Sequence, residues 1–82
     1  MKITPEHYNH MRDAIAELPL DAVRAHKVAL AETARGDVDM RFRWDLSHAA
    51  KLTPWICGNV YDYADDSHID TALRAIVREL AL

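Results

Sequence analysis

Residues 69–80 have the pattern that most constrains how this chain can fold. Ser67 and Asp70 stand in the S-x-x-D spacing of a capping box and predict a helix start, with Thr71, Arg74 and Arg78 on one side of the helix that follows. Apolar residues recur on the opposite side at Ile69, Ala72, Leu73, Ile76, Val77 and Leu80. This spacing gives a continuous apolar stripe, which other elements must cover.

The first part of the chain has equally local helix signals. Thr4 followed by Pro5 predicts an N-cap and first helical position, and the helix is expected to reach Leu18. Asp21 predicts the cap of a second helix, which Gly36 is expected to end.

Two more helices are expected between residues 37 and 64. The first is predicted to begin at residues 37–39 and to end at Leu52, with Phe42 on its core-facing stripe. Thr53 and Pro54 restart the chain as a further helix, whose apolar spacing continues to Ala64. No segment alternates with a period of two residues. The sequence therefore predicts an all-α fold, a compact single-domain bundle of about five short helices over residues 1–82.

Composition and motifs exclude several classes of function. The net charge of -3 argues against affinity that comes mainly from neutralising phosphates. The single cysteine cannot form an internal disulfide, and no leader or membrane-spanning stretch is present, so we expect a cytoplasmic protein without membrane attachment. No nucleotide-binding glycine motif or nucleophile elbow occurs, and Cys57 is interpreted as a packing residue. We therefore predict no catalytic residue and no enzyme.

The five histidines raise the question of a metal site. His7 and His10 are three residues apart and could share an ion, but a zinc site needs three or four ligands. His26 lies near the apolar face of its helix and is interpreted as a hydrogen-bonded packing residue. We predict no metal site and no cofactor.

Residues 46–60 resemble the helix-turn-helix pattern, which gives one hypothesis for function. Thr53, Trp55 and Asn59 would contact the nucleic acid. However, Lys51 stands where the turn usually has glycine, and the second helix has no Arg or Lys. Exposure of Trp55 and Asn59 beside a basic rim would favour DNA binding, and burial of Trp55 would count against it. Gly58 is interpreted as a point where a neighbour approaches the backbone.

A second hypothesis places a protein-binding patch on the helix that contains both Phe42 and Trp44. Trp44 is rotated by about 200° from Phe42, so the two aromatics cannot share one face. Trp44 must therefore meet a second layer of the bundle or face a partner. The candidate partner-binding residues are Met40, Arg41, Arg43, Trp44 and His48. Asp37 and Asp39 are spaced to pair with the two arginines, which predicts a solvated, paired face.

Three segments in the second half of the chain resemble a group of small bacteriophage and prophage proteins of unknown function. They are Arg43-Trp44-Asp45-Leu46, Leu52-Thr53-Pro54-Trp55-Ile56-Cys57 and residues 66–77, DSHIDTALRAIV. The resemblance implies a bacterial cytoplasm and a role in modulating a host or phage protein. We therefore expect a small non-enzymatic helical protein that binds another protein or itself, with helix-turn-helix DNA binding through residues 46–62 as the alternative.

Overall fold

The computed structural model describes residues 3–32 and 39–81, with the side chains in these ranges except those of residues 29–32 and 39–41. Within the described ranges there are five helices and no strand, which confirms the all-α prediction. The helices are α1 (Pro5–Ala16), α2 (Leu20–Glu32), α3 (Asp39–Ala49), α4 (Thr53–Asn59) and α5 (Asp66–Leu80). The predicted helix end at Gly36 lies outside the described residues.

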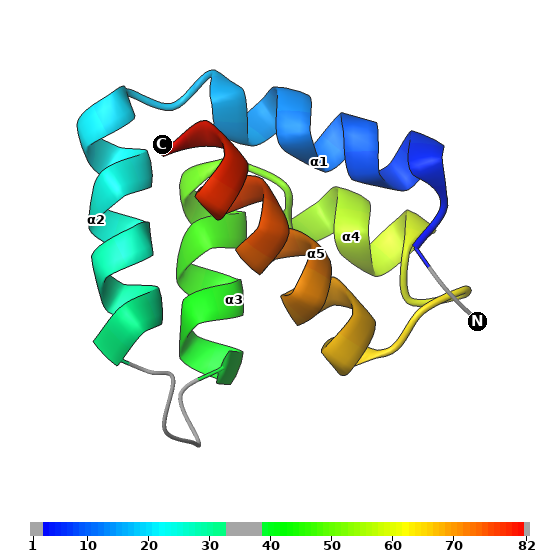
Figure 1. Ribbon diagram of the computed structural model, residues 1–82. Helices are drawn as coiled ribbons and strands as arrows, with labels where there is room; N and C mark the ends of the chain where they lie inside the picture. Colours follow the sequence, from blue (N-terminus) through cyan, green and yellow to red (C-terminus); the bar gives the residue numbers. More distant parts are fainter. Residues whose placement is uncertain (1–2, 33–38, 82) are drawn as a thin grey trace.

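Helix α5 occupies the middle of the bundle (Figure 1), where it packs against α1, α2 and α3. Helix α3 also packs against α2 and α4. The Cα radius of gyration is 11.6 Å, close to the value of about 11.7 Å expected for a compact chain of this length. The bundle is therefore one compact unit built around its last helix.

The core is almost entirely aliphatic. From α5 it includes Ile69, Leu73, Ile76 and Val77, each 0 % exposed, so the stripe predicted from the sequence does face the interior. The other helices and the segments between them contribute Met11, Ile15, Val23, Phe42, Leu46, Leu52, Ile56 and Val60. Phe42 is the only buried aromatic side chain among the described residues.

The start of α5 differs from the predicted capping box. The N-cap is Asp65, two residues before Ser67, and its carboxylate accepts hydrogen bonds from the backbone N–H of His68 and the Ser67 hydroxyl. The ring Nδ1 of His68 accepts in return from the backbone N–H of Asp65, so these two residues form the capping box of α5. Asp70, which was predicted to complete the box, is instead only 8 % exposed and faces the interior. Local pattern alone could not choose between Asp65 and Ser67, two possible cap residues that are two positions apart.

Helices α3 and α4 are both shorter than predicted. Helix α3 ends at Ala49 rather than Leu52, because Lys51 adopts a left-handed backbone conformation with φ 59°. This is the turn position at which helix-turn-helix proteins usually have glycine. Helix α4 ends at Asn59, and turns take the chain from Val60 to α5. The predicted continuation to Ala64 is therefore wrong.

Gly58 does not mark the close approach of a neighbouring element, contrary to the sequence interpretation. A Cβ atom at this position would have nothing within 4 Å. We expect Gly58→Ala to raise the free energy of unfolding by about 0.5 to 1 kcal/mol, because alanine restricts the unfolded chain and favours the helix. Urea denaturation of the two proteins measures the difference, with Cys57→Ala at the adjacent exposed position as control. A lower stability of Gly58→Ala would restore the close-approach interpretation.

Candidate functional site

Most aromatic side chains of this protein lie at its surface. Both tryptophans are partly buried, as are Tyr8 and Tyr61, and Tyr63 is 51 % exposed. Phe42, by comparison, is 3 % exposed. Buried Tyr and Trp need hydrogen-bond partners, which an aliphatic core this small does not provide.

Four of the surface aromatics and two histidines form two separate groups of ring contacts, which together are here called the aromatic arc. It consists of His7 and His10 from α1, Trp44 from α3, Trp55 from α4, and Tyr61 and Tyr63 from the segment between α4 and α5. The rings of His10 and Trp55 are stacked, with centroids 3.9 Å apart. The His7 ring contacts Trp55 edge-on at 5.8 Å and Tyr63 at 5.7 Å. The rings of Trp44 and Tyr61 are 6.4 Å apart.

The predicted partner-binding patch on α3 is divided by the fold. Trp44 is partly buried and His48 is exposed, with their ring centroids 6.5 Å apart. Arg43 is 4 % exposed and is not part of any exposed patch. The side chains of Met40 and Arg41 lie outside the described residues. Trp44 and His48 thus remain as the surface residues of the original patch.

The expected solvated position of Arg43 is wrong, and the register of α3 explains why. Arg43 precedes Leu46 and Ser47 by three and four residues, and both are fully buried. The guanidinium therefore points into the bundle, where Nη1 lies 2.9 Å from Asp70 Oδ1 and Nη2 lies 3.4 Å from Asp66 Oδ2. The predicted pairing with acidic residues 37 and 39 lies outside the described side chains. Arg43 instead joins α3 to α5.

The predicted DNA-contacting residues do not form a basic surface. Trp55 is partly buried under His7 and His10. Asn59 is exposed, and its side-chain amide donates to the Trp55 carbonyl oxygen within α4. Thr53 Oγ1 lies 3.3 Å from His48 Nδ1. Helix α4 contains no Arg or Lys, so the basic rim that DNA binding would need is missing from this helix. Trp55 is neither fully exposed nor fully buried, so its position alone does not decide for or against DNA binding.

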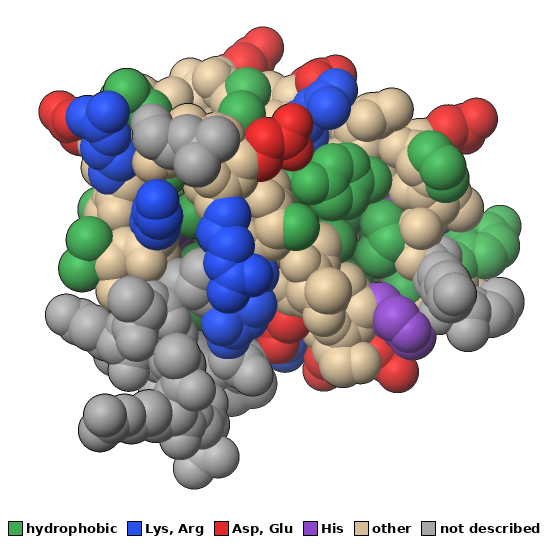
Figure 2. Space-filling model, in the orientation of Figure 1, with side chains coloured by type: hydrophobic (Ala, Val, Ile, Leu, Met, Phe, Trp, Pro, Cys, Tyr) green, Lys and Arg blue, Asp and Glu red, His purple; other side chains and the backbone are tan. Residues whose placement is uncertain are grey.

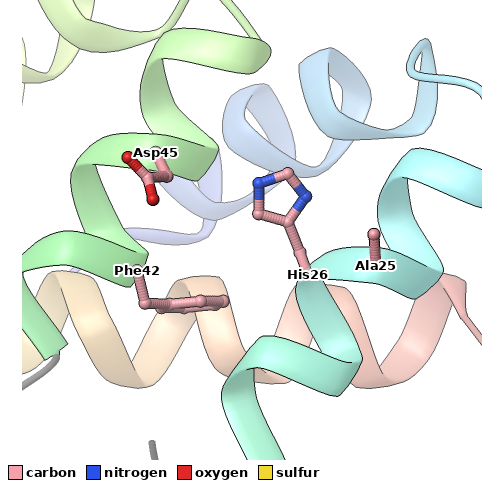
Figure 3. A pocket seen from close by; sticks show the side chains of 4 residues that line it. All are labelled: Ala25, His26, Phe42 and Asp45. Atoms are coloured by element: carbon pink, nitrogen blue, oxygen red, sulfur yellow. The ribbon is translucent and has the colours of Figure 1, made fainter. Parts of the chain in front are cut away.

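A small hollow between α2 and α3 is lined by Ala25, His26, Phe42 and Asp45, with a volume of about 150 Å³ (Figure 3). His26 Nδ1 lies 2.8 Å from the Ala22 carbonyl oxygen, which can only accept, so Nδ1 is the protonated nitrogen. This confirms His26 as a hydrogen-bonded packing residue. Nε2 points into the hollow from the α2 side, and Asp45 lies on the α3 side (Figure 3).

Neither the histidine pair on α1 nor the lone thiol forms a recognisable reaction centre. The rings of His7 and His10 pack on Trp55. Within residues 3–32 and 39–81, no group of three His, Cys, Asp or Glu side chains could hold a metal ion. Cys57 is exposed, so its interpretation as a packing residue is wrong: it lies on the solvent side of α4, next to buried Ile56.

Tyr61 is held in its neutral form. Burial, followed by a hydrogen bond to Asp66 and the charge of that carboxylate, raises the pKa of Tyr61 to about 12. Because Asp66 also contacts Arg43, the phenol hydroxyl, the carboxylate and the guanidinium form one connected group. This connection fixes the ring of Tyr61 against Trp44 in the aromatic arc.

The raised pKa of Tyr61 predicts a loss of stability in alkali. The unfolded phenol loses its proton near pH 10.0, whereas the folded phenol keeps it until about pH 12. The contribution of Tyr61 to the free energy of unfolding is therefore fully present below pH 10 and decreases as the pH rises towards 12. Ultraviolet titration of phenolate should show one tyrosine ionising near the upper value, and Tyr61→Phe should remove that step. A titration unchanged by the substitution would contradict the assignment to Tyr61.

Comparisons with known proteins assign no family. No protein-family model matches the sequence, and neither a curated protein nor a solved structure matches it. In the part of the chain that the structure describes, no helix is long and apolar enough to cross a membrane.

The aromatic arc was only partly visible in the sequence. The sequence indicates Trp44 as a candidate for a protein interface, where Trp is frequent, and Trp55 only as a DNA contact of the helix-turn-helix pattern. The sequence pattern places Tyr61 and Tyr63 within a helix and offers His7 only as a metal ligand. Two aromatics separated by one residue and followed by acidic residues could have indicated an exposed turn rather than a helix.

Proposed function

We propose that this chain is a small non-enzymatic helical protein that acts in the bacterial cytoplasm by binding another protein through the aromatic arc. The observation that supports the proposal is that both tryptophans and all three tyrosines are at least partly exposed, while Phe42 is the one aromatic side chain in the core of the described residues. Tyr and Trp are the residues most enriched in the energetically important parts of protein interfaces. The resemblance of the second half of the chain to phage proteins suggests a host or phage factor as the partner.

The shapes of the surface hollows agree with a protein ligand better than with a small substrate. A typical site for a small molecule is enclosed and buries most of its ligand. The hollows beside the arc are shallow and open to solvent, and they include one of about 470 Å³ lined by Thr4, Pro5, Glu6, His7 and Tyr63. Broad, shallow surfaces with partly exposed aromatics are typical of protein contacts.

Helix-turn-helix DNA binding is the alternative proposal, and one observation favours it. The left-handed Lys51 gives the turn between α3 and α4 the conformation that this motif requires. The second helix, however, has seven residues and no cation. Base and phosphate contacts depend on such side chains. We expect short duplex DNA to bind weakly and without sequence preference at physiological salt, and specific nanomolar binding would reverse the order of the two proposals.

Site-specific photo-crosslinking tests the protein-binding proposal. A photoreactive phenylalanine analogue replaces Tyr63 in one protein and Val28 in another, since these side chains are 51 % and 60 % exposed. We expect discrete adducts with host proteins, or with a second copy, from position 63. Position 28 on α2 is the matched exposed control and should give none of these adducts.

Two variants connect the adducts to the arc. Trp55→Ala should reduce the crosslinks from position 63, whereas Leu20→Ala, at an exposed position of α2, should leave them unchanged. Circular dichroism confirms that each variant is folded. Identical adducts from positions 63 and 28 would show that contact is non-specific and would refute the arc as the binding surface.

A further inference from the structure

Two hollows meet at the first turns of α5, and their chemistry differs. The first is a groove of about 360 Å³ between α1 and α5 with mostly apolar walls. Its lining residues are Ile3, Tyr8, Ser67, His68, Thr71, Ala72 and Ala75. Figure 2 shows hydrophobic side chains gathered between α1 and the first half of α5, while the Lys and Arg side chains on this face lie mainly over α2 and the rest of α5.

The second hollow shares one lining residue, His68, with the first. It has a volume of about 310 Å³ and is formed by two tyrosines, two carboxylates, Ala64 and this histidine. The tyrosines are Tyr61 and Tyr63, and the carboxylates are Asp62 and Asp65. None of these lining residues is Lys or Arg.

The negative charge of the second hollow is fixed. Hydrogen bonds from the Ser67 hydroxyl and the His68 backbone N–H keep the pKa of Asp65 below its usual value, so this carboxylate stays ionised at neutral pH. Asp62 is exposed on the same wall. The nearby guanidinium of Arg43 is turned inward to Asp70 and Asp66 and lines neither hollow. A cation entering the hollow would meet carboxylates and the rings of two tyrosines.

Aromatic rings and carboxylates together form the environment that a Lys or Arg side chain prefers at an interface. The ring faces attract the cation through their quadrupoles, and the carboxylates add charge-assisted hydrogen bonds. An acidic segment or a nucleic acid would meet repulsion from the same carboxylates. The apolar groove beside this hollow would bind an aliphatic or aromatic side chain. That side chain could come from the partner segment that supplies the cation, one residue or one helical turn away from it.

We propose that the two hollows bind one segment of a partner protein in which an apolar side chain lies next to Lys or Arg. The apolar side chain enters the groove between α1 and α5, and the cation enters the hollow between Tyr61 and Tyr63. This inference rests on the proposed protein-binding function and specifies the chemistry of the segment that is bound. It places the recognition of charge at Asp62 and Asp65.

A pair of synthetic peptides tests the proposal directly on the full chain. The probe is a fluorescein-labelled peptide of about twelve residues that repeats Leu-Lys-Ala-Lys, and its control has Glu in place of each Lys. Fluorescence anisotropy should show binding of the lysine peptide, weakened by added salt, and no binding of the glutamate peptide. Equal binding of both peptides, or no binding of the lysine peptide at millimolar concentration, would overturn the proposal.

Substitutions assign the binding to the two hollows. The double variant Asp62→Asn/Asp65→Asn, in which Asn keeps the ability to cap α5, should weaken binding of the lysine peptide by about tenfold or more. Ala75→Lys should do the same, because it fills the apolar groove and repels the cation. Unchanged affinity in either variant would overturn the proposal.

Matched controls lie at the far end of α1 and on α3. Asp13→Asn/Glu17→Gln removes the same charge from exposed positions, and Ala49→Lys introduces the same side chain at an exposed alanine. Both should bind the lysine peptide within about twofold of the wild type. If the peptide results are negative while the crosslinks from position 63 persist, protein binding stands and only the preference for cations fails. Loss of both would remove both proposals.

Discussion

Asp70→Ala should lower the free energy of unfolding by about 3 to 5 kcal/mol, because it leaves the Arg43 guanidinium buried without its closest carboxylate. The two side chains are 5 % and 12 % exposed, and their atoms are 2.9 Å apart. The remaining contact, to Asp66 at 3.4 Å, is longer and involves a side chain that is 60 % exposed. Urea denaturation followed by circular dichroism measures the loss.

An exposed ion pair provides the control for this prediction. Arg12 Nε and Asp13 Oδ1 are 3.9 Å apart with side chains 37 % and 77 % exposed, so Asp13→Ala should cost less than about 1 kcal/mol. If the two alanine variants were equally stable, the pair between α3 and α5 would not be an important contact.

The double variant Arg43→Met/Asp70→Leu separates two quantities. One is the net contribution of the ion pair to the free energy of unfolding, and the other is the cost of leaving one of its charges buried without a partner. Arg43 Nε is buried and has no hydrogen-bond partner among the described residues, so the native pair is not fully satisfied. Apolar residues of similar size avoid this penalty. We expect the double variant to recover most of the stability lost in Asp70→Ala. A double variant as unstable as the single one would show that the charged pair itself stabilises the packing of α3 on α5.

Phe42→Ala should cost about 3 to 5 kcal/mol, the second large effect, because it opens a cavity where α3 faces the core. Phe42 is 3 % exposed, and the Arg74 guanidinium carbon lies 5.5 Å from its ring centroid. Trp44→Ala should cost only about 1 to 2 kcal/mol, because part of its surface is already in water. Its ring contacts are with Tyr61, His48 and the guanidinium of Arg43, whose carbon lies 5.6 Å from the ring centroid.

The comparison of these two variants also tests the role of Trp44. In the protein with the photoreactive residue at position 63, Trp44→Ala should abolish the crosslinks, or the self-association measured by sedimentation. The conservative variant Phe42→Leu should leave both unchanged. If Trp44→Ala unfolded the protein as severely as Phe42→Ala, Trp44 would be a structural residue and no longer a candidate for partner binding.

Parts of the candidate site could be predicted because their signal is local. The opposite positions of Phe42 and Trp44 on α3 follow from the helical repeat alone, and the structure puts Phe42 in the core and Trp44 at the surface. The inward position of Arg43 could not be predicted in this way. Arg43 and Asp70 are 27 residues apart, and nothing near either residue indicates the other.

The sequence by itself determined the all-α class, the approximate positions of the helices and the buried face of α5. These features depend on caps, prolines and apolar spacing, which act within a few residues. Only the tertiary structure decided that His7 contacts Trp55 and Tyr63, and that the start of α5 borders two hollows. A periodic pattern tells which residues share a face of a helix. Which faces meet depends on how all the helices pack together, and this is a property of the whole core.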